Sequence, residues 1–257
     1  MLNPIPAERI SAYVERILVI DNYSINAPFA LPLFANGTPT LLFLTTKAAI
    51  NGNATNYLTL FGQTVFPEKL TIREDFTLIA YFFKPFALFS LFGVSAKELT
   101  DYPIDLDLLQ RSQANELKEK MLNAGTTTAM MKLLDEYIFN LIESSKAEIQ
   151  LIQFATSIIA NNPSKESLLN VQKELCMTER TFERLFDKRV GISPSLFRRI
   201  CQFNSAFQQL NSRRFGKLTD LAFENGYADQ SHFIRAFREF TNITPKEYLN
   251  YGRQEPE

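Results

Sequence analysis

The sequence predicts an α+β protein in which a strand-rich N-terminal domain precedes an all-α C-terminal domain. Three observations predict this fold class. Residues 1–112 hold short β-branched and aromatic segments separated by turn signals, which are typical of strands. From residue 150 onward, apolar residues recur at helical spacing between short corners. The helical part also matches itself after a shift of 51 residues, which indicates one structural unit used twice.

The strand-rich part contains the segments ERILVI, TPTLLFLTT, NYLTLFG and FTLIAYFF. Short strands at such regular spacing predict a sandwich or a barrel, with a cupin-like barrel as one form. Helical character begins at Phe86 and continues to Leu99. Within it, Ser95 and Glu98 have the spacing of a capping box.

Residues 113–149 form a helical connector between the two parts. Met131, Leu134, Ile138 and Leu141 recur in it at three- and four-residue spacing and make an apolar stripe. This stripe either packs on the N-terminal domain or pairs with a partner chain.

The composition narrows the class of protein. The chain of 257 residues has two cysteines, Cys176 and Cys201, and one histidine. Such a set is too small for a zinc site, so we expect no metal and no cofactor. It also argues against a disulfide-stapled secreted protein, and no apolar run is long enough to span a membrane. We therefore expect a cytoplasmic protein whose cysteines are buried structural thiols and not oxidant sensors.

Charge is divided unevenly along the chain. Residues 1–149 carry 12 Lys and Arg against 16 Asp and Glu, whereas residues 150–257 carry 15 against 12. The C-terminal domain, 150–257, is therefore the part suited to an anionic partner.

The repeat aligns Thr181–Phe197 with His232–Tyr248. Local signals give each unit the same boundaries. Thr178 and Asp229 are suited to cap the second helix of each unit, and Gly191 and Asn242 fall where those helices end. Thr244 to Glu247 spells a further capping box with proline at the first helical position. In the corner before the second helix, one unit has Gly226 where the other has Cys176, which closes a turn less easily.

Each unit is thus a helix, a corner and a helix, at about 168–190 and 218–241, which is helix-turn-helix geometry. Phenylalanines on one face of the second helix point to a small core, while the opposite face is polar and basic. A polar face is usually just solvated. Two copies with matched arginines and caps in the basic half favour DNA, because an α-helix fits the major groove.

These residues carry a resemblance to a known family. KLTDLAFENGYADQSHFIRAFREFTNITPKEYLN resembles the signature of AraC/XylS-type transcription regulators, and SLLNVQKELCMTERTFERLFDKRVGISPSLF resembles that family's first motif. The resemblance implies that the two second helices enter successive major grooves of double-stranded DNA. The base-facing candidates that it implies are Arg180, Thr181, Arg184, Gln230, Ser231, His232 and Arg235, and the phosphate-facing candidates are Lys188, Arg189 and Arg238.

The resemblance also implies an N-terminal domain that senses a small molecule, forms a homodimer, or does both, and RNA polymerase as a further partner. The effector, the operator and the sign of regulation stay open. Phe82, Phe83, Phe86, Phe89 and Phe92 are suited to line an apolar pocket, but ordinary core is the better interpretation.

Two other classes of function compete with a regulator. An architectural DNA-binding protein needs no sensory domain. An enzyme needs convergent acid and base groups, for which Asp101, Asp105 and Asp107 are the candidates, although a loop with solvated charges explains them better. We therefore expect a bacterial DNA-binding regulator that is not an enzyme.

Overall fold

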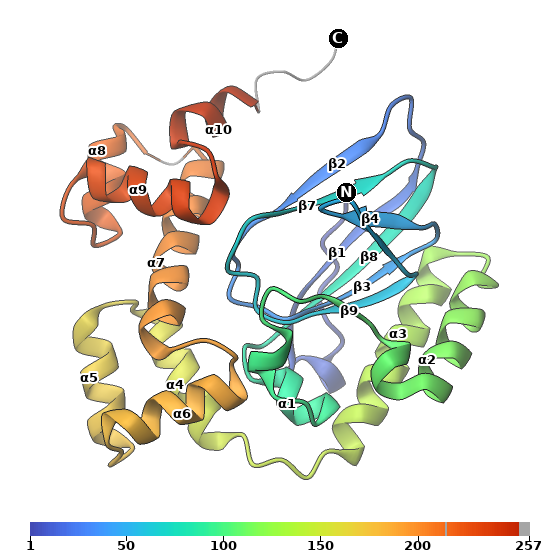
Figure 1. The fold of residues 1–257 in the computed structure, drawn as a ribbon, viewed down its shortest axis with the longest axis horizontal. Coiled ribbons are helices and arrows are strands. Elements are labelled where there is room, and N and C mark those ends of the chain that lie inside the picture. The colour runs from blue at the N-terminus through green and yellow to red at the C-terminus, as the bar shows by residue number, and fades with distance from the viewer. Residues whose placement is uncertain (214, 252–257) are drawn as a thin grey trace.

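The N-terminal half of the chain is a sandwich of two antiparallel sheets (Figure 1). The computed structural model describes residues 1–213 and 215–251, so the last residues of the predicted C-terminal domain, 252–257, lie outside the described part. One sheet has the strand order β1-β8-β3-β6-β9 and the other β2-β7-β4-β5. The strands are β1 (Val14–Tyr23), β2 (Phe29–Leu33), β3 (Thr40–Leu44), β4 (Ala48–Ile50), β5 (Asn53–Thr55), β6 (Leu58–Phe61), β7 (Glu68–Ile72), β8 (Phe76–Phe83) and β9 (Ile104–Asp105).

Strand β3 shows why its sequence, TLLFL, is apolar throughout. Successive side chains of a strand point to opposite faces of the sheet. Leu42 and Leu44 therefore enter the core between the two sheets, while Leu41 and Phe43 enter a second core under the helices. Because both faces are covered, every residue of the strand is buried.

Helices cover the outer face of the five-stranded sheet. Leu88, Leu117 and Leu134, from three different helices, share one buried cluster with Leu41 and Phe43. The covering elements are η1 (Glu8–Ile10), α1 (Ala87–Phe92), η2 (Ala96–Leu99), α2 (Asp107–Leu122) and α3 (Thr127–Ser144).

The apolar stripe of the connector lies on α3. Leu134, Ile138 and Leu141 are buried, and Met131 is half-buried against the same cluster. The hydroxyl of Tyr81, on β8, donates a hydrogen bond of 2.6 Å to Asp135 Oδ1 on this helix. Of the two alternatives left open by the sequence, the structure shows the stripe packed on the N-terminal domain.

The predicted capping box at Ser95 is wrong. Within the described residues, the Ser95 hydroxyl caps no backbone N–H of the helix that follows. That helix, η2, is a short 3₁₀ turn, whose bonds join residues three apart. The Ser95 carbonyl therefore accepts from the Glu98 N–H at 3.0 Å, and the hydroxyl is not needed.

The C-terminal half is helical throughout its regular elements. Figure 1 shows α7 joining one group of helices, α4 to α6, to a second group, α8 to α10. The pairs α5/α6 and α8/α9 are the two helix-turn-helix units, and the first begins slightly earlier than expected, at Lys165. The bounds are α4 (Gln150–Asn161), α5 (Lys165–Glu174), α6 (Glu179–Arg189), α7 (Pro194–Asn211), α8 (Leu218–Glu224), α9 (Gln230–Thr241) and α10 (Pro245–Tyr251).

The predicted caps of the repeat are present. Thr178 accepts from the Thr181 N–H at 3.3 Å, and Asp229 accepts from the His232 N–H at 2.7 Å. The box before α10 is reciprocal, because the Glu247 carboxylate accepts from the Thr244 N–H while the Thr244 hydroxyl accepts from the Glu247 N–H. These bonds satisfy N–H groups that a helix start leaves without a partner.

Helix ends follow the predicted left-handed positions. Gly191 has φ +97° and Asn242 has φ +63°, each just after a second helix. In the corners, Gly226 has φ +73° and Cys176 has φ +51°. The cysteine therefore occupies a conformation that disfavours any side chain with a Cβ.

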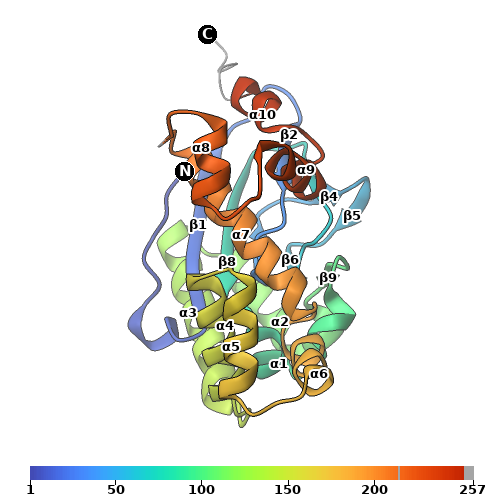
Figure 2. The same ribbon diagram turned by 90° about the vertical axis from the view of Figure 1, so that its left-hand side faces the viewer.

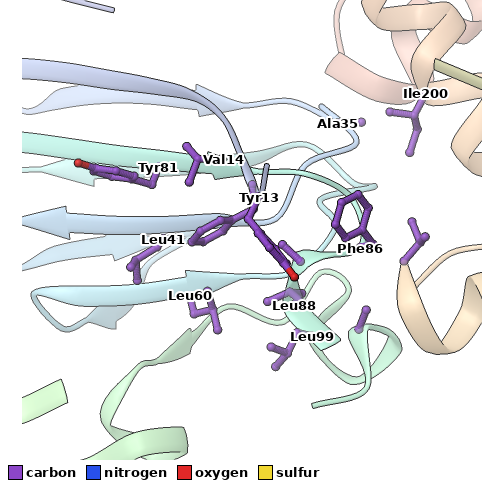
Figure 3. Packing of buried hydrophobic residues seen from close by; sticks show 14 of the residues in the cluster. Tyr13, Val14, Ala35, Leu41, Leu60, Tyr81, Phe86, Leu88, Leu99 and Ile200 are labelled. Carbon is purple, nitrogen blue, oxygen red and sulfur yellow. The ribbon is translucent and has the colours of Figure 1, made fainter. Parts of the chain in front are cut away.

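The two halves share one hydrophobic cluster. It runs from Ile10 near the N-terminus to Phe240 on α9. In Figure 3, Ala35, from the segment after β2, faces Ile200 of α7. Both residues are at most 1% exposed, so the contact between the domains is dry at this point.

The corner residues lead to a stability prediction. We expect Cys176→Gly to stabilise the protein by up to about 1 kcal/mol, because glycine relieves the left-handed strain. The matched change Gly226→Ala should destabilise by about 1 kcal/mol, since it introduces the same strain in the other unit. Urea unfolding of both variants measures the two effects. Destabilisation by Cys176→Gly would contradict the strain argument.

Candidate nucleic-acid interface

The second helix of each unit presents a polar face to solvent. On α6, Phe182 and Phe186 are buried, and the exposed face carries Arg180, Thr181 and Arg184. On α9, the buried residues are Phe233, Ala236, Phe237, Phe240 and Thr241, and the exposed face carries Ser231, His232, Arg235 and Arg238. Arg184 and Arg235 occupy equivalent places in the repeat, and both are exposed.

Two of the base-facing candidates are held by their own unit. The side-chain oxygen of Gln230 accepts from the Thr219 hydroxyl at 2.9 Å, and this residue is half-buried against α8. His232 Nδ1 accepts from the Ala228 N–H at 3.4 Å, and its ring lies edge-on to Tyr227. These contacts brace the corner, whereas Ser231 and Arg235 are turned outward.

Thr181 has a similar double position. Its hydroxyl lies 2.9 Å from the Thr178 hydroxyl, so the base-facing candidate also takes part in the cap of α6. In the first unit, the remaining base-facing candidates are therefore Arg180 and Arg184, whose side chains take no part in this cap.

The three phosphate-facing candidates differ in their surroundings. Arg238 is exposed on α9. The ammonium of Lys188 lies 5.0 Å from the ring centre of Phe89, and the guanidinium of Arg189 lies 4.1 Å from it. Phe89 belongs to α1, so both cations at the end of α6 lie near the N-terminal domain, where Arg189 is half-buried and Lys188 stays exposed.

Helix α7 fixes both second helices through aromatic contacts. Phe197, at its start, packs on Phe186 of α6 with ring centres 5.9 Å apart. Phe203 packs on Phe237 and Phe240 of α9 at 5.6 and 5.2 Å. An ion pair between Arg199 and Glu239 joins the same two helices. The separation of α6 and α9 is therefore set by one rigid element.

A cleft of about 920 Å³, which the sequence did not predict, separates the sheets from α7. We call it the interdomain cleft. Figure 2 shows α7 crossing in front of the strands that form its far wall. Strands supply Arg16, Leu18, Leu42, Phe61, Leu70 and Phe82, and α7 supplies Phe197, Cys201, Phe203, Asn204, Phe207 and Gln208. Because its lining comes from many separate segments, no single motif marks it.

Arg16 is the basic residue of the interdomain cleft. Its guanidinium lies 3.4 Å from the ring centre of Phe82, which is a cation–π distance. The side chain is open to solvent in the cleft, yet the surrounding walls desolvate it and lower the pKa of Arg16. Glu15, its neighbour, opposes that shift.

The five phenylalanines between the end of β8 and the end of α1 have different surroundings. Phe83 and Phe86 are buried in the core, as the sequence indicated. Phe92 packs beside Phe83, Phe82 lines the interdomain cleft, and Phe89 contacts the end of α6.

The acidic loop is structural. Asp101 Oδ1 accepts from the N–H groups of Val65 and Phe66 at 2.7 and 3.0 Å. Asp105 accepts from the Asn56 N–H at 3.0 Å. Both carboxylates therefore anchor neighbouring backbone. In the described part of the chain, no three His, Cys, Asp or Glu side chains gather as metal ligands would.

The expectation of two buried thiols is wrong for Cys176, which is exposed because it sits in the corner between α5 and α6. Cys201 is partly buried at the interdomain cleft, and desolvation raises its pKa to about 12. Its thiol therefore stays protonated and unreactive at neutral pH. Among residues 1–213 and 215–251, no helix has the length and apolarity needed to cross a bilayer.

Comparison with known proteins agrees with this geometry. Residues 171–251 match the model of a helix-turn-helix domain, and residues 3–105 match a domain of unknown function, DUF6597. An uncharacterized HTH-type transcriptional regulator of Haemophilus influenzae is 27% identical over 153 residues, which are 57% of this chain and 51% of the relative. The chain thus spans about half the length of that curated relative.

Solved structures share the architecture. ToxT from Vibrio cholerae superposes with a TM-score of 0.54 at 12% identity, over 91% of this chain and 97% of ToxT. A ToxT structure bound to (E)-4-(8-methylnaphthalen-1-yl)but-3-enoic acid gives 0.52 at 11% identity, over 91% and 98%. ToxT bound to an unsaturated fatty acid gives 0.50 at 12% identity, over 91% and 94%. At such identities the likeness shows the fold.

Residues 171–251 therefore hold a helix-turn-helix domain, in which α5/α6 and α8/α9 are the two capped units joined by α7. The helix-turn-helix domain resembles that of AraC-type regulators, as the signature in the sequence indicated.

Proposed function

We propose that the chain binds double-stranded DNA at specific sites through α6 and α9, and that a small acidic ligand in the interdomain cleft alters this binding. One observation carries the proposal. Helix α7 holds both second helices on its aromatic contacts and also lines the interdomain cleft. A single rigid element therefore connects the ligand site to the DNA-reading surface.

DNA readout is assigned to the outward residues. Arg180 and Arg184 on α6, with Ser231 and Arg235 on α9, are exposed donors on helices of the right size for a major groove. Arginine recognises guanine through two parallel bonds. Thr181, Gln230 and His232 act in support, since they also brace the caps and corner. Arg238 contacts phosphate from the end of α9.

The ligand class follows from the interdomain cleft. Its volume of about 920 Å³ falls within the usual range for small-molecule sites. Its lining mixes apolar and polar side chains, and Arg16, beside the carboxylate of Glu15, is its one guanidinium. Such a site suits an apolar molecule whose carboxylate pairs with Arg16. The acids bound in the ToxT structures belong to this chemical class. An architectural DNA-binding protein has no use for such a cleft, so a sensor is the better function.

A homodimer and a contact with RNA polymerase are further proposals. The α3 stripe cannot be the dimer surface, because Leu134 and Ile138 are fully buried within the chain. Sedimentation at micromolar concentration, with and without DNA, measures the oligomeric state. A monomer under both conditions would remove the dimer and leave DNA binding in place.

The DNA prediction separates base readers from phosphate contacts. We expect Arg235→Ala to weaken binding to the selected site by roughly 1–3 kcal/mol and to relax base preference in one half of it. Arg238→Ala should weaken all sequences equally and lower the salt slope by about one unit. Selection from a random DNA pool, followed by titration at several salt concentrations, measures both.

Arg73→Ala is the matched control for that experiment. Arg73 is an exposed arginine between β7 and β8, so its removal should change neither affinity nor preference. We expect Arg184→Ala to be less damaging than Arg235→Ala, because Glu183 adds a negative charge to α6 beside Arg184. Folded protein that enriched no sequence would contradict site-specific binding.

The ligand prediction concerns Arg16. Oleate at about 100 times its Kd would add about 2.7 kcal/mol of stability. For a chain of this size, that raises Tm by roughly 5–10 °C. We expect Arg16→Gln to abolish most of the rise, since the carboxylate loses its partner. Differential scanning fluorimetry with oleate and with oleyl alcohol measures the part that depends on charge.

Arg9→Gln is the control for Arg16→Gln. The Arg9 guanidinium also lies over a ring, that of Phe139 at 5.0 Å, but it does not line the interdomain cleft. This variant should keep the full response. An equal response in wild type and Arg16→Gln would rule out Arg16 as the carboxylate site.

A further inference from the structure

The C-terminal end of α6, the second helix of the first unit and hence the first recognition helix in the proposed DNA binding, contacts the N-terminal domain. Both ribbon views place α6 beside α1 (Figures 1 and 2). Lys97 Nζ, on η2, lies 2.7 Å from Asp187 Oδ2 on α6. The Thr100 hydroxyl donates to the Gly191 carbonyl at 3.0 Å, just beyond the end of α6. The helix terminus is therefore held by charge and by a hydrogen bond.

The same contact engages two cations that the first motif would need on DNA. The Arg189 guanidinium stacks 4.1 Å from the ring centre of Phe89, and the Lys188 ammonium lies 5.0 Å from it. A cation over an aromatic face gains from the negative charge of that face. Arg189 is half-buried in this position. Its Nη1 atom is buried there, so that atom can reach a phosphate of the duplex only when the guanidinium leaves Phe89.

The contact between α6 and the N-terminal domain is tightly packed at Gly191 but leaves one polar atom of Arg189 without a partner. A Cβ placed on Gly191 would lie 2.7 Å from the Ala96 carbonyl oxygen and from the Thr100 hydroxyl, so only glycine permits this approach. Arg189 Nη1, in contrast, is buried with no hydrogen-bond acceptor among the described residues. A buried donor without an acceptor is unfavourable. Phosphate oxygens would supply the missing acceptors.

We propose that this contact, which we call the α6 clamp, is autoinhibitory. The N-terminal domain holds Arg189 on Phe89, with the exposed Lys188 beside it, and the first motif gains its full phosphate contacts only when the α6 clamp opens. The inference rests on the proposed DNA binding and adds a regulation to it. The contacts that make up the α6 clamp all lie at α6 and the residue that ends it, so the inhibition acts on the first motif of the two.

The energetics suit a contact that opens. The Lys97–Asp187 pair is exposed, with side chains 65% and 40% accessible, and such pairs contribute little to stability. The cation–π stack is the stronger part, and the unpaired Arg189 Nη1 opposes it. Salt bridges from Lys188 and Arg189 to phosphates can therefore compete with the docked state.

Phe89→Ala tests the α6 clamp without changing the DNA-reading helices. The probe is a 30-base-pair duplex of mixed sequence, titrated by fluorescence anisotropy between 50 and 300 mM salt. We expect the variant to bind several-fold more tightly than wild type, with a salt slope steeper by about one to two units. Phe92→Ala is the matched control, because Phe92 lies on the same helix but packs beside Phe83 of the sheet.

Lys97→Asp opens the α6 clamp by a second route. It breaks the ion pair while making the N-terminal domain more acidic, so tighter DNA binding cannot come from added positive charge. Lys47→Asp, at an exposed position between β3 and β4, changes the charge equally and should not tighten binding. Hydrogen exchange of amides 186–192 should be faster in Phe89→Ala and in Lys97→Asp than in their controls.

The outcomes separate the two proposals. DNA affinity, salt slope and exchange that are equal in wild type and Phe89→Ala would overturn the α6 clamp and leave DNA binding intact. Faster exchange with weaker DNA binding would show that docking assists α6, which also overturns it. Folded protein that binds no duplex in any variant would contradict the proposed function, and the inhibition would fall with it.

Discussion

The C-terminal half of the structure depends on the burial of α7 on several sides. Phe197, Ile200 and Phe203 are each at most 1% exposed, and they face different partners. Phe197 meets α6, Ile200 meets the segment after β2, and Phe203 meets α9. A helix held in this way cannot turn about its axis without breaking three contacts at once. The two second helices and one wall of the interdomain cleft are therefore positioned by the same constraint.

Polar contacts within α7 extend this role. Gln202 is buried, and its amide donates to the Asn225 carbonyl at the end of α8, while its oxygen accepts from Arg198. Arg198 also donates to the Pro163 carbonyl, just before α5. One side-chain pair thus ties the start of α5 and the end of α8 to α7. Gln202 would lose its bonds if the units turned, and an unpaired buried group is unfavourable, so Gln202 also specifies how the units are oriented.

A structural feature could be predicted from the sequence when residues close together in the chain determine it. The caps at Thr178 and Asp229, and the left-handed residues after the second helices, are set by neighbours within a few residues, and the sequence predicted them. The same local reasoning predicted a strained turn at Cys176, and the φ of +51° at this residue confirms it.

Features assembled from distant segments could not be predicted. The interdomain cleft takes residues from strands and from α7, and Phe89 meets α6 across about 100 residues of chain. Nothing near Arg189 in the sequence indicates an aromatic partner, so its contact with Phe89 appears only in the structure, and its role as a phosphate contact stays a prediction. The capping box predicted at Ser95 was wrong for a different reason. The sequence pattern of a capping box does not distinguish an α-helix from a 3₁₀ turn.

The two units differ in how they meet the N-terminal domain, and this difference decides where a ligand can act. Beside the second unit, α7 and α10 meet the N-terminal domain through aromatic packing, with Phe34 against Phe207 at 5.7 Å and against Tyr248 at 6.4 Å. The first is joined through the exposed Lys97–Asp187 pair and the stack on Phe89.

Apolar packing persists in salt, whereas exposed charge pairs are screened. A ligand in the interdomain cleft touches α7, whose own contacts with α6 and α9 are core contacts and resist change. The softer boundary is the one between α6 and the N-terminal domain. We therefore expect an effector to change how the first unit is docked, while the spacing of the two recognition helices along α7 stays fixed.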